Sequence, residues 1–271
     1  MQLLCSTGAF SRHPDRCEPS TVAEGIRALG SERIEAIFYT PWYDDIETAA
    51  RELRATGASI PVLHTEKSIG GLASSSAPQD HERAADLLRA NCRLATALGA
   101  RTLVLHLWSQ PDTEESVAMA VAVLPRLLDV TEEHGLDLSV ETIWRTTSTP
   151  LPAIHAALAV DARTRVTLDT EFLGHHGELE ESIADDALWA SGAIDHVQIK
   201  DFAGSMTDDA GRRQYLHPGE GSLDLEGFMR GLRSRGYRGT VSLEASGVID
   251  SRTVDYDRIR KSLATISSWM A

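Results

Sequence analysis

The sequence predicts an α/β fold, a single closed (β/α)8 barrel of eight parallel strands, each followed by a helix. Two observations predict it: short apolar runs alternate with longer segments of helical periodicity, and no linker or low-complexity tract interrupts the 271 residues. A barrel of this kind needs about 250 residues. We therefore expect residues 1–271 to form one domain.

The strand candidates are eight runs rich in Val, Ile and Leu. They are residues 3–6, 34–39, 60–64, 102–106, 136–141, 165–169, 194–200 and 240–244. Such composition is typical of parallel strands that are buried on both faces. An open, doubly wound sheet is the alternative fold, and it is disfavoured because no G-x-G-x-x-G or G-x-x-x-x-G-K-[ST] motif opens a helix.

Two intervening segments show clear helical periodicity. Residues 81–98 place apolar side chains on one stripe, which predicts an amphipathic helix. Residues 112–134 predict a second helix, with Asp112 as N-cap, Glu115 as its capping-box partner and a kink at Pro125. The stretch Ser68–Gln79 is rich in Ser and Gly, so it predicts either a mobile flap or a solvated connector.

Composition and charge exclude several classes of protein. The 26 basic and 40 acidic residues give a net charge of −14, which disfavours nucleic acids and anionic membranes as partners. Three dispersed cysteines suggest neither a disulfide framework nor a thiolate zinc site. The first ten residues show neither a signal peptide nor a membrane span, so we expect a cytoplasmic protein. Only three residues are lysines, which makes each lysine informative.

Polar side chains recur where the predicted strands end. In a barrel of this kind the strand ends and the loops after them carry the chemistry. These residues are His64, His106 with Trp108, Glu141, Asp169, the alternating trio His196, Gln198 and Lys200, and Glu244.

Four of these residues supply oxygen ligands from four consecutive strands. Glu141, Asp169, Gln198 and Glu244 would converge at the barrel mouth, where three carboxylates repel one another unless a cation lies between them. A hard divalent ion such as Mg or Mn suits an all-oxygen set, although Co or Zn could also bind. Each carboxylate on its own could equally be a helix cap or a loop hydrogen-bond acceptor.

Other residues near the strand ends could each have either a functional or a structural role. His64 and His106 are either substrate contacts or structural histidines, and Trp108 and Trp144 are either pocket walls or packing. The adjacent pair His175 and His176 is expected mainly in a loop.

An ordered set of motifs carries a resemblance to a known family. They are a Glu that ends the fifth strand, L-D-T on the sixth, H-V-Q-I-K-D on the seventh, a G-E-G turn at 219–221, and a final L-E. With these motifs the chain resembles, over nearly its whole length, the xylose isomerase-like TIM barrels, a superfamily of sugar isomerases and epimerases that also contains endonuclease IV. The resemblance implies that Glu141, Asp169, Gln198 and Glu244 are metal ligands, with Gln198 as in hydroxypyruvate isomerase-like members.

Departures from the endonuclease IV pattern help to decide which branch of the superfamily the chain resembles. That branch holds three zinc ions and requires histidines where this chain has Phe172 and Tyr215, and an aspartate where it has Arg213. The trinuclear site is therefore incomplete. Together with the negative charge, this argues against DNA repair and for a single-metal sugar enzyme.

The resemblance implies isomerisation or epimerisation through a metal-stabilised enediolate, with Glu141 and Glu244 as the acid/base pair. Lys200 either polarises a substrate oxygen or forms an ion pair with Asp201 or a nearby acid. The candidate substrate-binding residues are His64, His106, Trp108, Arg145, His196 and His217. A metal-dependent lyase acting on a keto sugar or cyclitol is the runner-up, and a non-catalytic barrel that binds a ligand or a partner is a third reading.

The expected cofactor is one divalent metal ion, Mn or Mg before Co or Zn, and the expected partner is a small-molecule carbohydrate. The sequence does not decide between free and phosphorylated sugars, because no Gly-rich phosphate loop is present and the arginines are dispersed. The resembling proteins are often dimers or tetramers, so a homo-oligomer is compatible with the resemblance.

Overall fold

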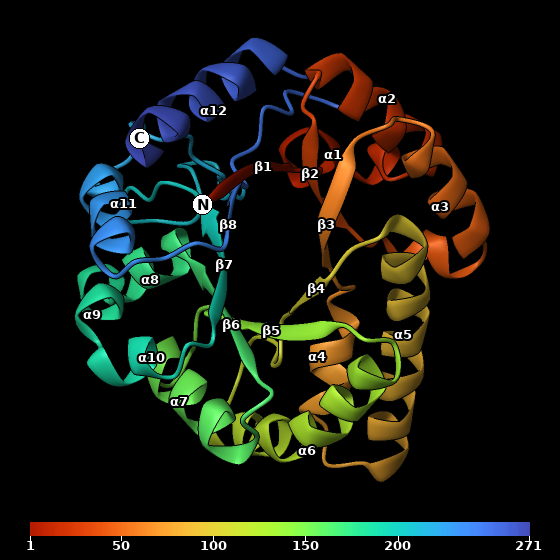
Figure 1. Cartoon of the computed structure of the whole chain (residues 1–271), viewed down its shortest axis with the longest axis vertical. Coiled ribbons are helices and arrows are strands. Elements are labelled where there is room, and N and C mark those ends of the chain that lie inside the picture. The colour runs from red at the N-terminus through yellow and green to blue at the C-terminus, as the bar shows by residue number, and fades with distance from the viewer.

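Eight parallel strands close into a barrel in the order β1 to β8, and β8 pairs with β1. The structure is a computed structural model that describes residues 1–271. Its helices form an outer ring around the strands (Figure 1). The strands are β1 Gln2–Ser6, β2 Arg33–Ile37, β3 Ser59–His64, β4 Thr102–Leu105, β5 Asp137–Glu141, β6 Arg165–Asp169, β7 Ile194–Ile199 and β8 Thr240–Leu243.

The expected (β/α)8 barrel is therefore confirmed, and every predicted strand agrees with the observed one to within two residues at each end. The helices are α1 Gly8–Ser11, α2 Pro19–Leu29, α3 Ile46–Arg54, α4 Ser68–Ala73, α5 Pro78–Leu98, α6 Glu114–Glu133, α7 Pro150–Val160, α8 Thr170–His176, α9 Leu179–Ala184, α10 Asp186–Ala190, α11 Leu225–Ser234 and α12 Tyr256–Met270. Short 3-10 turns occupy Pro14–Arg16 and Thr40–Tyr43. None of the helices combines the length and the apolar character that a membrane span requires.

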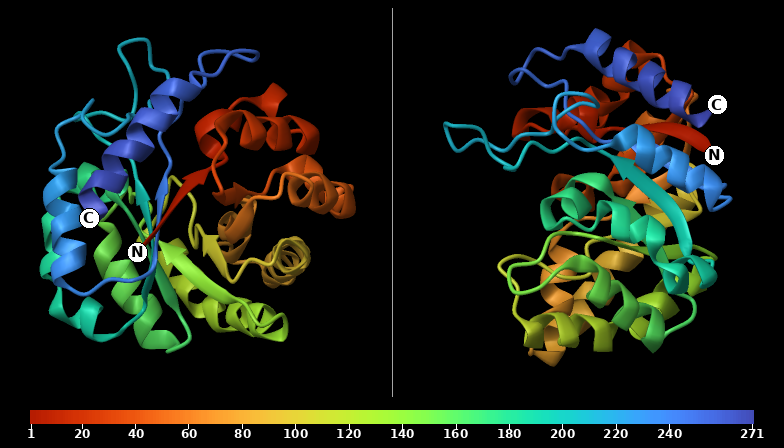
Figure 2. Two further views of the ribbon diagram at one scale, coloured as in Figure 1. Left: turned by 45° about the horizontal axis from the view of Figure 1, so that its top comes forward. Right: turned by 90° about the vertical axis from the view of Figure 1, so that its left-hand side faces the viewer.

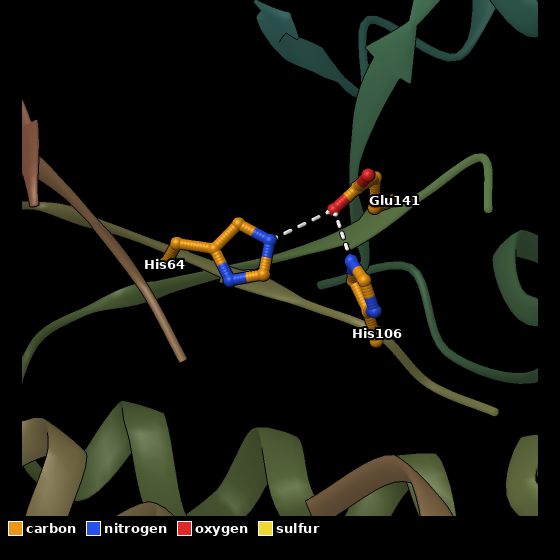
Figure 3. A group of neighbouring side chains, drawn as sticks. All are labelled: His64, His106 and Glu141. Carbon is orange, nitrogen blue, oxygen red and sulfur yellow. Dashed lines mark hydrogen bonds and ion pairs between the residues drawn. The ribbon is translucent and has the colours of Figure 1, made fainter. Parts of the chain in front are cut away.

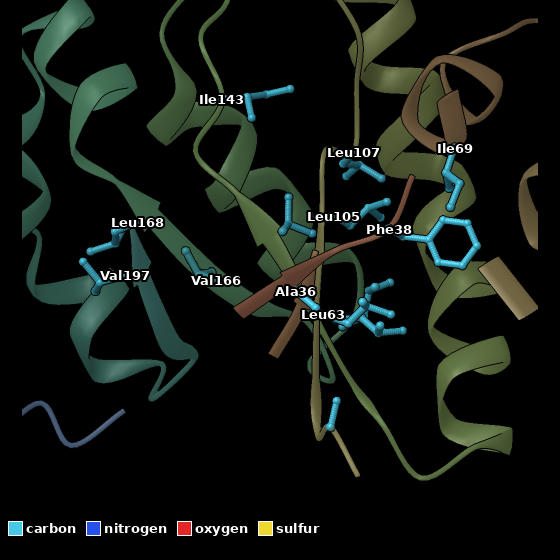
Figure 4. Packing of buried hydrophobic residues seen from close by; sticks show 14 of the residues in the cluster. Ala36, Phe38, Leu63, Ile69, Leu105, Leu107, Ile143, Val166, Leu168 and Val197 are labelled. Carbon is cyan, nitrogen blue, oxygen red and sulfur yellow. The ribbon is translucent and has the colours of Figure 1, made fainter. Parts of the chain in front are cut away.

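The main hydrophobic core lies between the strands and the helices. Outward-facing strand residues such as Val197 and Ile199 join a cluster of 63 buried residues, part of which is visible around β2, β3 and β4 in Figure 4. Because side chains alternate along a strand, the residues between them face the barrel interior. On β7 these are His196 and Gln198, both fully buried. The interior is thus largely polar, and its side chains lead up to the mouth.

Two local predictions were wrong. Helix α6 begins after Thr113, whose side chain forms a capping box with Ser116, so neither Asp112 nor Glu115 has the predicted role. The Asp112 carboxylate is instead bonded to Arg145, a partner 33 residues away that local sequence does not reveal. The helix assignment is continuous through Pro125.

The stretch Ser68–Gln79 is neither a flap nor a solvated connector over most of its length, because Ser68–Ala73 forms helix α4. Ile69, Gly70 and Ala73 are buried, and Gly70 packs so tightly against the backbone of His106 that a Cβ atom there would overlap the carbonyl oxygen. Close backbone packing therefore docks this segment on the barrel. His175 and His176 also lie in a helix, α8, rather than in a loop.

The longest excursion from the barrel follows β7. Residues 201–224 leave the barrel as the loop that projects from it in the right-hand view of Figure 2. Isolated bridges pair Asp201 with Leu216 and Thr207 with Arg213. The Asp201 carboxylate accepts hydrogen bonds from the backbone amides of Gly219 and Leu223. These bonds fix the base of the loop, so its inner residues reach back over the mouth of the barrel.

Candidate active site

The strand ends surround a cavity of about 360 Å³. Its walls include most of the residues that the strand-end pattern singles out: His64, His106, Trp108, Glu141, Trp144, Lys200 and Glu244. The cavity lies within the size range of small-molecule sites. It is the natural place for the chemistry of this barrel, because the loops that follow the strands build the site at this end.

Glu141, at the end of β5, receives two histidines. His64 Nε2 lies 3.0 Å and His106 Nε2 2.9 Å from Glu141 Oε2, and the two rings approach this oxygen from β3 and from the end of β4 (Figure 3). Burial would raise the pKa of Glu141, but His106 and His64 outweigh it and hold the pKa well below its usual range. Glu141 is therefore a carboxylate at neutral pH.

The two histidines differ in their environments. Burial lowers the pKa of His106 to about 4, so this ring is neutral at physiological pH. Burial also acts against charge on His64, but the hydrogen bond to Glu141 and the negative charges of Glu141, Glu244 and Glu35 together outweigh burial and raise the pKa. His64 Nδ1 lies 3.0 Å from the carbonyl oxygen of Thr65, which orients Nε2 toward Glu141.

On the other side of the mouth, Lys200 bridges two carboxylates. Its Nζ atom lies 2.6 Å from Asp169 Oδ2 and 2.5 Å from Glu244 Oε2. Arg12 approaches the second oxygen of Glu244 at 2.7 Å. Burial would raise the pKa of Glu244, but Arg12 and then Lys200 lower it, so Glu244 is also ionised. The partners of Lys200 are thus Asp169 and Glu244, whereas Asp201 is bonded to loop amides.

Gln198 and His196 lie inside the barrel, below the cavity lining. Gln198 Nε2 donates to Glu35 Oε1 at 2.7 Å, and this bond leaves Gln198 Oε1 buried without a partner. His196 Nδ1 lies 2.7 Å from the hydroxyl of Thr240. His196 is therefore not among the residues that line the cavity, because the alternation of β7 turns it inward with Gln198.

Two further predicted substrate contacts lie away from the cavity walls. Arg145 is buried in ion pairs with Asp112 and Glu114, each at 2.8 Å. Both ring nitrogens of His217 are engaged, at 2.8 Å from Ser262 Oγ and 3.1 Å from the carbonyl oxygen of Ser246. Both side chains have a structural role in this fold. Their partners lie far away in the sequence, so the sequence alone does not reveal this role.

The structure adds wall residues that the strand-end pattern missed. Arg12 comes from the end of α1, Lys67 from the turn before α4, and Arg213 and Tyr215 from the loop after β7. The guanidinium groups of Arg12 and Arg213 lie 4.1 and 4.4 Å from the centre of the Tyr215 ring. Lys67 offered a signal, since it is one of three lysines and follows a strand end. The other three lie too far along their loops for strand-end reasoning to find them.

The oxygen atoms at the strand ends are suited to the divalent ion that the resemblance implies. Gln198 Oε1 is a buried acceptor without a hydrogen bond, and Gln198 is paired in register with Asp169 on the adjacent strand, whose Oδ2 is ion-paired with Lys200 at 2.6 Å. Burial and the neighbouring carboxylates Glu141, Glu171 and Glu244 raise the pKa of Asp169 to about 8, against the opposing effect of Lys200. An unsatisfied oxygen beside crowded carboxylates suits a hard cation.

A second donor group overlaps the first. His64, His106 and Glu141 offer ligand atoms that all lie within 4.8 Å of one another, and they form the one group of three or more His, Cys, Asp or Glu side chains that meets this spacing. Two imidazoles and a carboxylate suit transition metals such as Zn or Mn. The residues present therefore fit a divalent ion, and Glu141 belongs to both donor groups.

The fold and this site match a known family. A family model described as xylose isomerase-like TIM barrel matches residues 23–266. The chain belongs to this family, as its motifs indicate.

Several proteins to which the chain is similar are sugar epimerases. An L-ribulose 3-epimerase of Methylomonas sp. (strain DH-1) is 24% identical over 242 residues, which are 84% of this chain and 79% of that protein. The structure of D-allulose 3-epimerase from Methylomonas sp. in complex with D-allulose has a TM-score of 0.73 at 20% identity and covers 99% of this chain and 96% of its own. A structure of L-ribulose 3-epimerase has a TM-score of 0.75 at 18% identity, over 100% and 95% of the two chains.

Proposed function

We propose that the chain is a divalent-metal-dependent sugar epimerase that moves a proton at the carbon next to a carbonyl group. The observation that carries this proposal is the pair of ionised glutamates, Glu141 and Glu244, that line one cavity from strands separated by β6 and β7. Epimerisation inverts a carbon atom, so it needs one group that removes the proton and another that returns it on the opposite face. Two carboxylates on separate walls meet that requirement.

Each glutamate has a basic side chain beside it. His64 lies 3.0 Å from Glu141, and its raised pKa favours a protonated ring that can relay a proton to this carboxylate. Lys200 lies 2.5 Å from Glu244 and holds it in place together with Arg12. In the forward direction Glu244 removes the substrate proton and Glu141 returns one, and the reverse reaction exchanges their roles.

The divalent ion would be held by Glu141, Asp169, Gln198 and Glu244. His64 and His106 both contact the same oxygen of Glu141 and would orient this carboxylate. When bound, such an ion supplies positive charge that stabilises the oxyanion formed as the proton leaves. The Gln198 oxygen that has no hydrogen bond, on the strand next to Asp169, supports this assignment. Trp108 and Trp144 would supply the apolar wall against which the sugar ring or chain rests.

The test is turnover in D2O with Mn added. The protein should convert a ketopentose or ketohexose to an epimer of equal mass, apart from one deuterium at the inverted carbon, detectable by NMR. Glu141→Gln and Glu244→Gln should each lower kcat by at least about 1,000-fold, since each removes an essential proton carrier. Glu66→Gln is the matched control, because Glu66 also follows a strand end but does not line the cavity.

Two results would overturn the proposal. Near wild-type turnover in either glutamine variant would remove that residue from proton transfer. A product that has lost water would indicate elimination instead of epimerisation. Metal dependence is checked separately, by dialysis against EDTA and recovery of activity with Mn, Mg, Co or Zn.

A further inference from the structure

Four cationic side chains line the cavity of a strongly acidic protein. They are Arg12, Lys67, Lys200 and Arg213. The chain has a net charge of −14 and only three lysines, yet two of these lysines are in the cavity wall. The positive charge is thus concentrated at the site, where it attracts the negatively charged groups of a ligand.

Two of the four cations are fully occupied by carboxylates. Lys200 lies between Asp169 and Glu244. Arg213 forms a two-point contact with Glu171, in which Nη1 and Nη2 each lie 2.6 Å from one carboxylate oxygen. These charges are balanced by the protein itself.

The other two cations have unused capacity. Arg12 contacts a single carboxylate, that of Glu244, through Nη2, and its guanidinium lies over the Tyr215 ring, while its Nε is buried beside Gly8. Lys67 forms no ion pair and no hydrogen bond, and its side chain is exposed at the cavity mouth. Lys67 is therefore the one cation of the four that no carboxylate balances, and Arg12, in the same cavity wall, shares its single carboxylate partner, Glu244, with Lys200.

The position of Lys67 is fixed by the fold. It directly precedes α4, and α4 is docked through Gly70 against the backbone of His106. The base of the Lys67 side chain is thereby held at the rim of the cavity, opposite the loop that carries Tyr215. A lysine held in this way loses less freedom on binding than one on a mobile loop.

We infer that the substrate carries an anionic group, a carboxylate or a phosphate monoester, that binds between Lys67 and Arg12. This inference rests on the proposed epimerase function and narrows its substrate class to sugar acids or sugar phosphates. The D-allulose bound in the similar structure is a neutral sugar, so the inference separates this chain from that relative. A hydrogen bond to a charged group contributes about 1.5–3 kcal/mol, which corresponds to about 10–150-fold in affinity.

Binding and turnover test the inference independently. Calorimetry compares three acyclic six-carbon ligands that differ only at C6: D-sorbitol, L-gulonate and D-sorbitol 6-phosphate. Kinetics compare D-fructose, D-fructuronate and D-fructose 6-phosphate. The variants are Lys67→Met, Lys67→Arg as the charge-conserving rescue, and Lys261→Met as the control on the remaining lysine, outside the cavity.

We expect at least one anionic ligand to bind at least 10-fold more tightly than D-sorbitol, and Lys67→Met to remove most of that preference. Lys67→Arg should retain it, and Lys261→Met should match the wild type. The stronger of the two anionic ligands identifies the group as carboxylate or phosphate. Equal binding of all three ligands, or a preference that survives Lys67→Met, would overturn the inference.

The inference and the proposed function fail in different ways. Epimerisation of D-fructose with no anion preference would leave the epimerase proposal standing and reject the anionic substrate. A Lys67-dependent preference for L-gulonate or D-sorbitol 6-phosphate without epimerisation of any ketose would support the anion site and reject the reaction.

Discussion

Two buried charged networks, one around Arg145 and one around Lys200, differ in whether their polar atoms find partners. Arg145 bonds to Asp112 and Glu114, and Asp112 also accepts from the backbone amide of Thr146 at 2.6 Å. None of the buried side-chain atoms in this network lacks a hydrogen bond. It therefore has the character of a structural clamp that ties the loop after β5 to the start of α6.

In and around the Lys200 network, by contrast, some buried side-chain atoms have no hydrogen bond. Seven buried side-chain atoms in the chain lack a hydrogen bond, and all belong to the barrel interior or the cavity wall: those of Arg12, Glu35, Trp108, Asp169, His196, Gln198 and Ser242. Buried polar groups are nearly always satisfied in native proteins. Their concentration here shows that the protein's own side chains do not satisfy all polar groups of the barrel interior and the cavity wall. The comparison separates a charged network that the protein completes by itself from one that it leaves partly open.

The largest expected effect comes from removing one cation from each network. Arg145→Met and Lys200→Met should each lower the free energy of unfolding by about 3–5 kcal/mol, because each leaves a buried carboxylate without its partner. Added Mn should reduce the deficit of Lys200→Met relative to wild type, since the ion can neutralise Asp169 and Glu244 in place of the ammonium. The deficit of Arg145→Met should stay unchanged. Urea denaturation with and without Mn measures both, and equal responses of the two variants would contradict the comparison.

A smaller effect is expected where helix α4 docks beside the site. Gly70→Ala should destabilise the protein by about 1–3 kcal/mol, because the added methyl group overlaps the His106 carbonyl and forces α4 outward. Gly71→Ala is the matched control, since its new methyl group meets only Ser109, at 3.6 Å or more, and helix propensity favours Ala over Gly by up to about 1 kcal/mol. Thermal melting of both variants tests this, and similar losses in both would show that α4 is not docked through Gly70.

The smallest effect is a pH dependence within the Arg145 network. Burial would raise the pKa of Asp112, but the hydrogen bonds from Arg145 and Thr146 outweigh it and lower the pKa. A lowered folded-state pKa contributes stability that is present above the unfolded value of about 3.9 and is lost as the pH falls through the folded value. Wild-type stability should therefore fall more steeply than that of Asp112→Asn below about pH 4, by at most about 1.4 kcal/mol per pH unit. Urea denaturation between pH 3 and 6 measures this, with the exposed Asp209→Asn as control; parallel curves for wild type and Asp112→Asn would contradict it.

The sequence by itself determined the barrel and the strand-end chemistry. Strand identity depends on short apolar runs, and the end of each run marks where a side chain reaches the mouth, so Glu141, Asp169, Lys200 and Glu244 were identifiable without coordinates. These are local properties. Each requires only the alternation of a strand and the common geometry of parallel strands in a barrel.

Only the tertiary structure decided which charges belong to the site. Arg145 and His217 have the same local appearance as binding residues, but their partners lie 33 and 45 residues away and occupy them fully. Arg12 and Tyr215 reach the cavity from loops more than 200 residues apart and meet only when the barrel closes. The physical reason is that the role of a charged side chain depends on the groups it contacts. Tertiary packing, and not the neighbouring sequence, determines which groups those are.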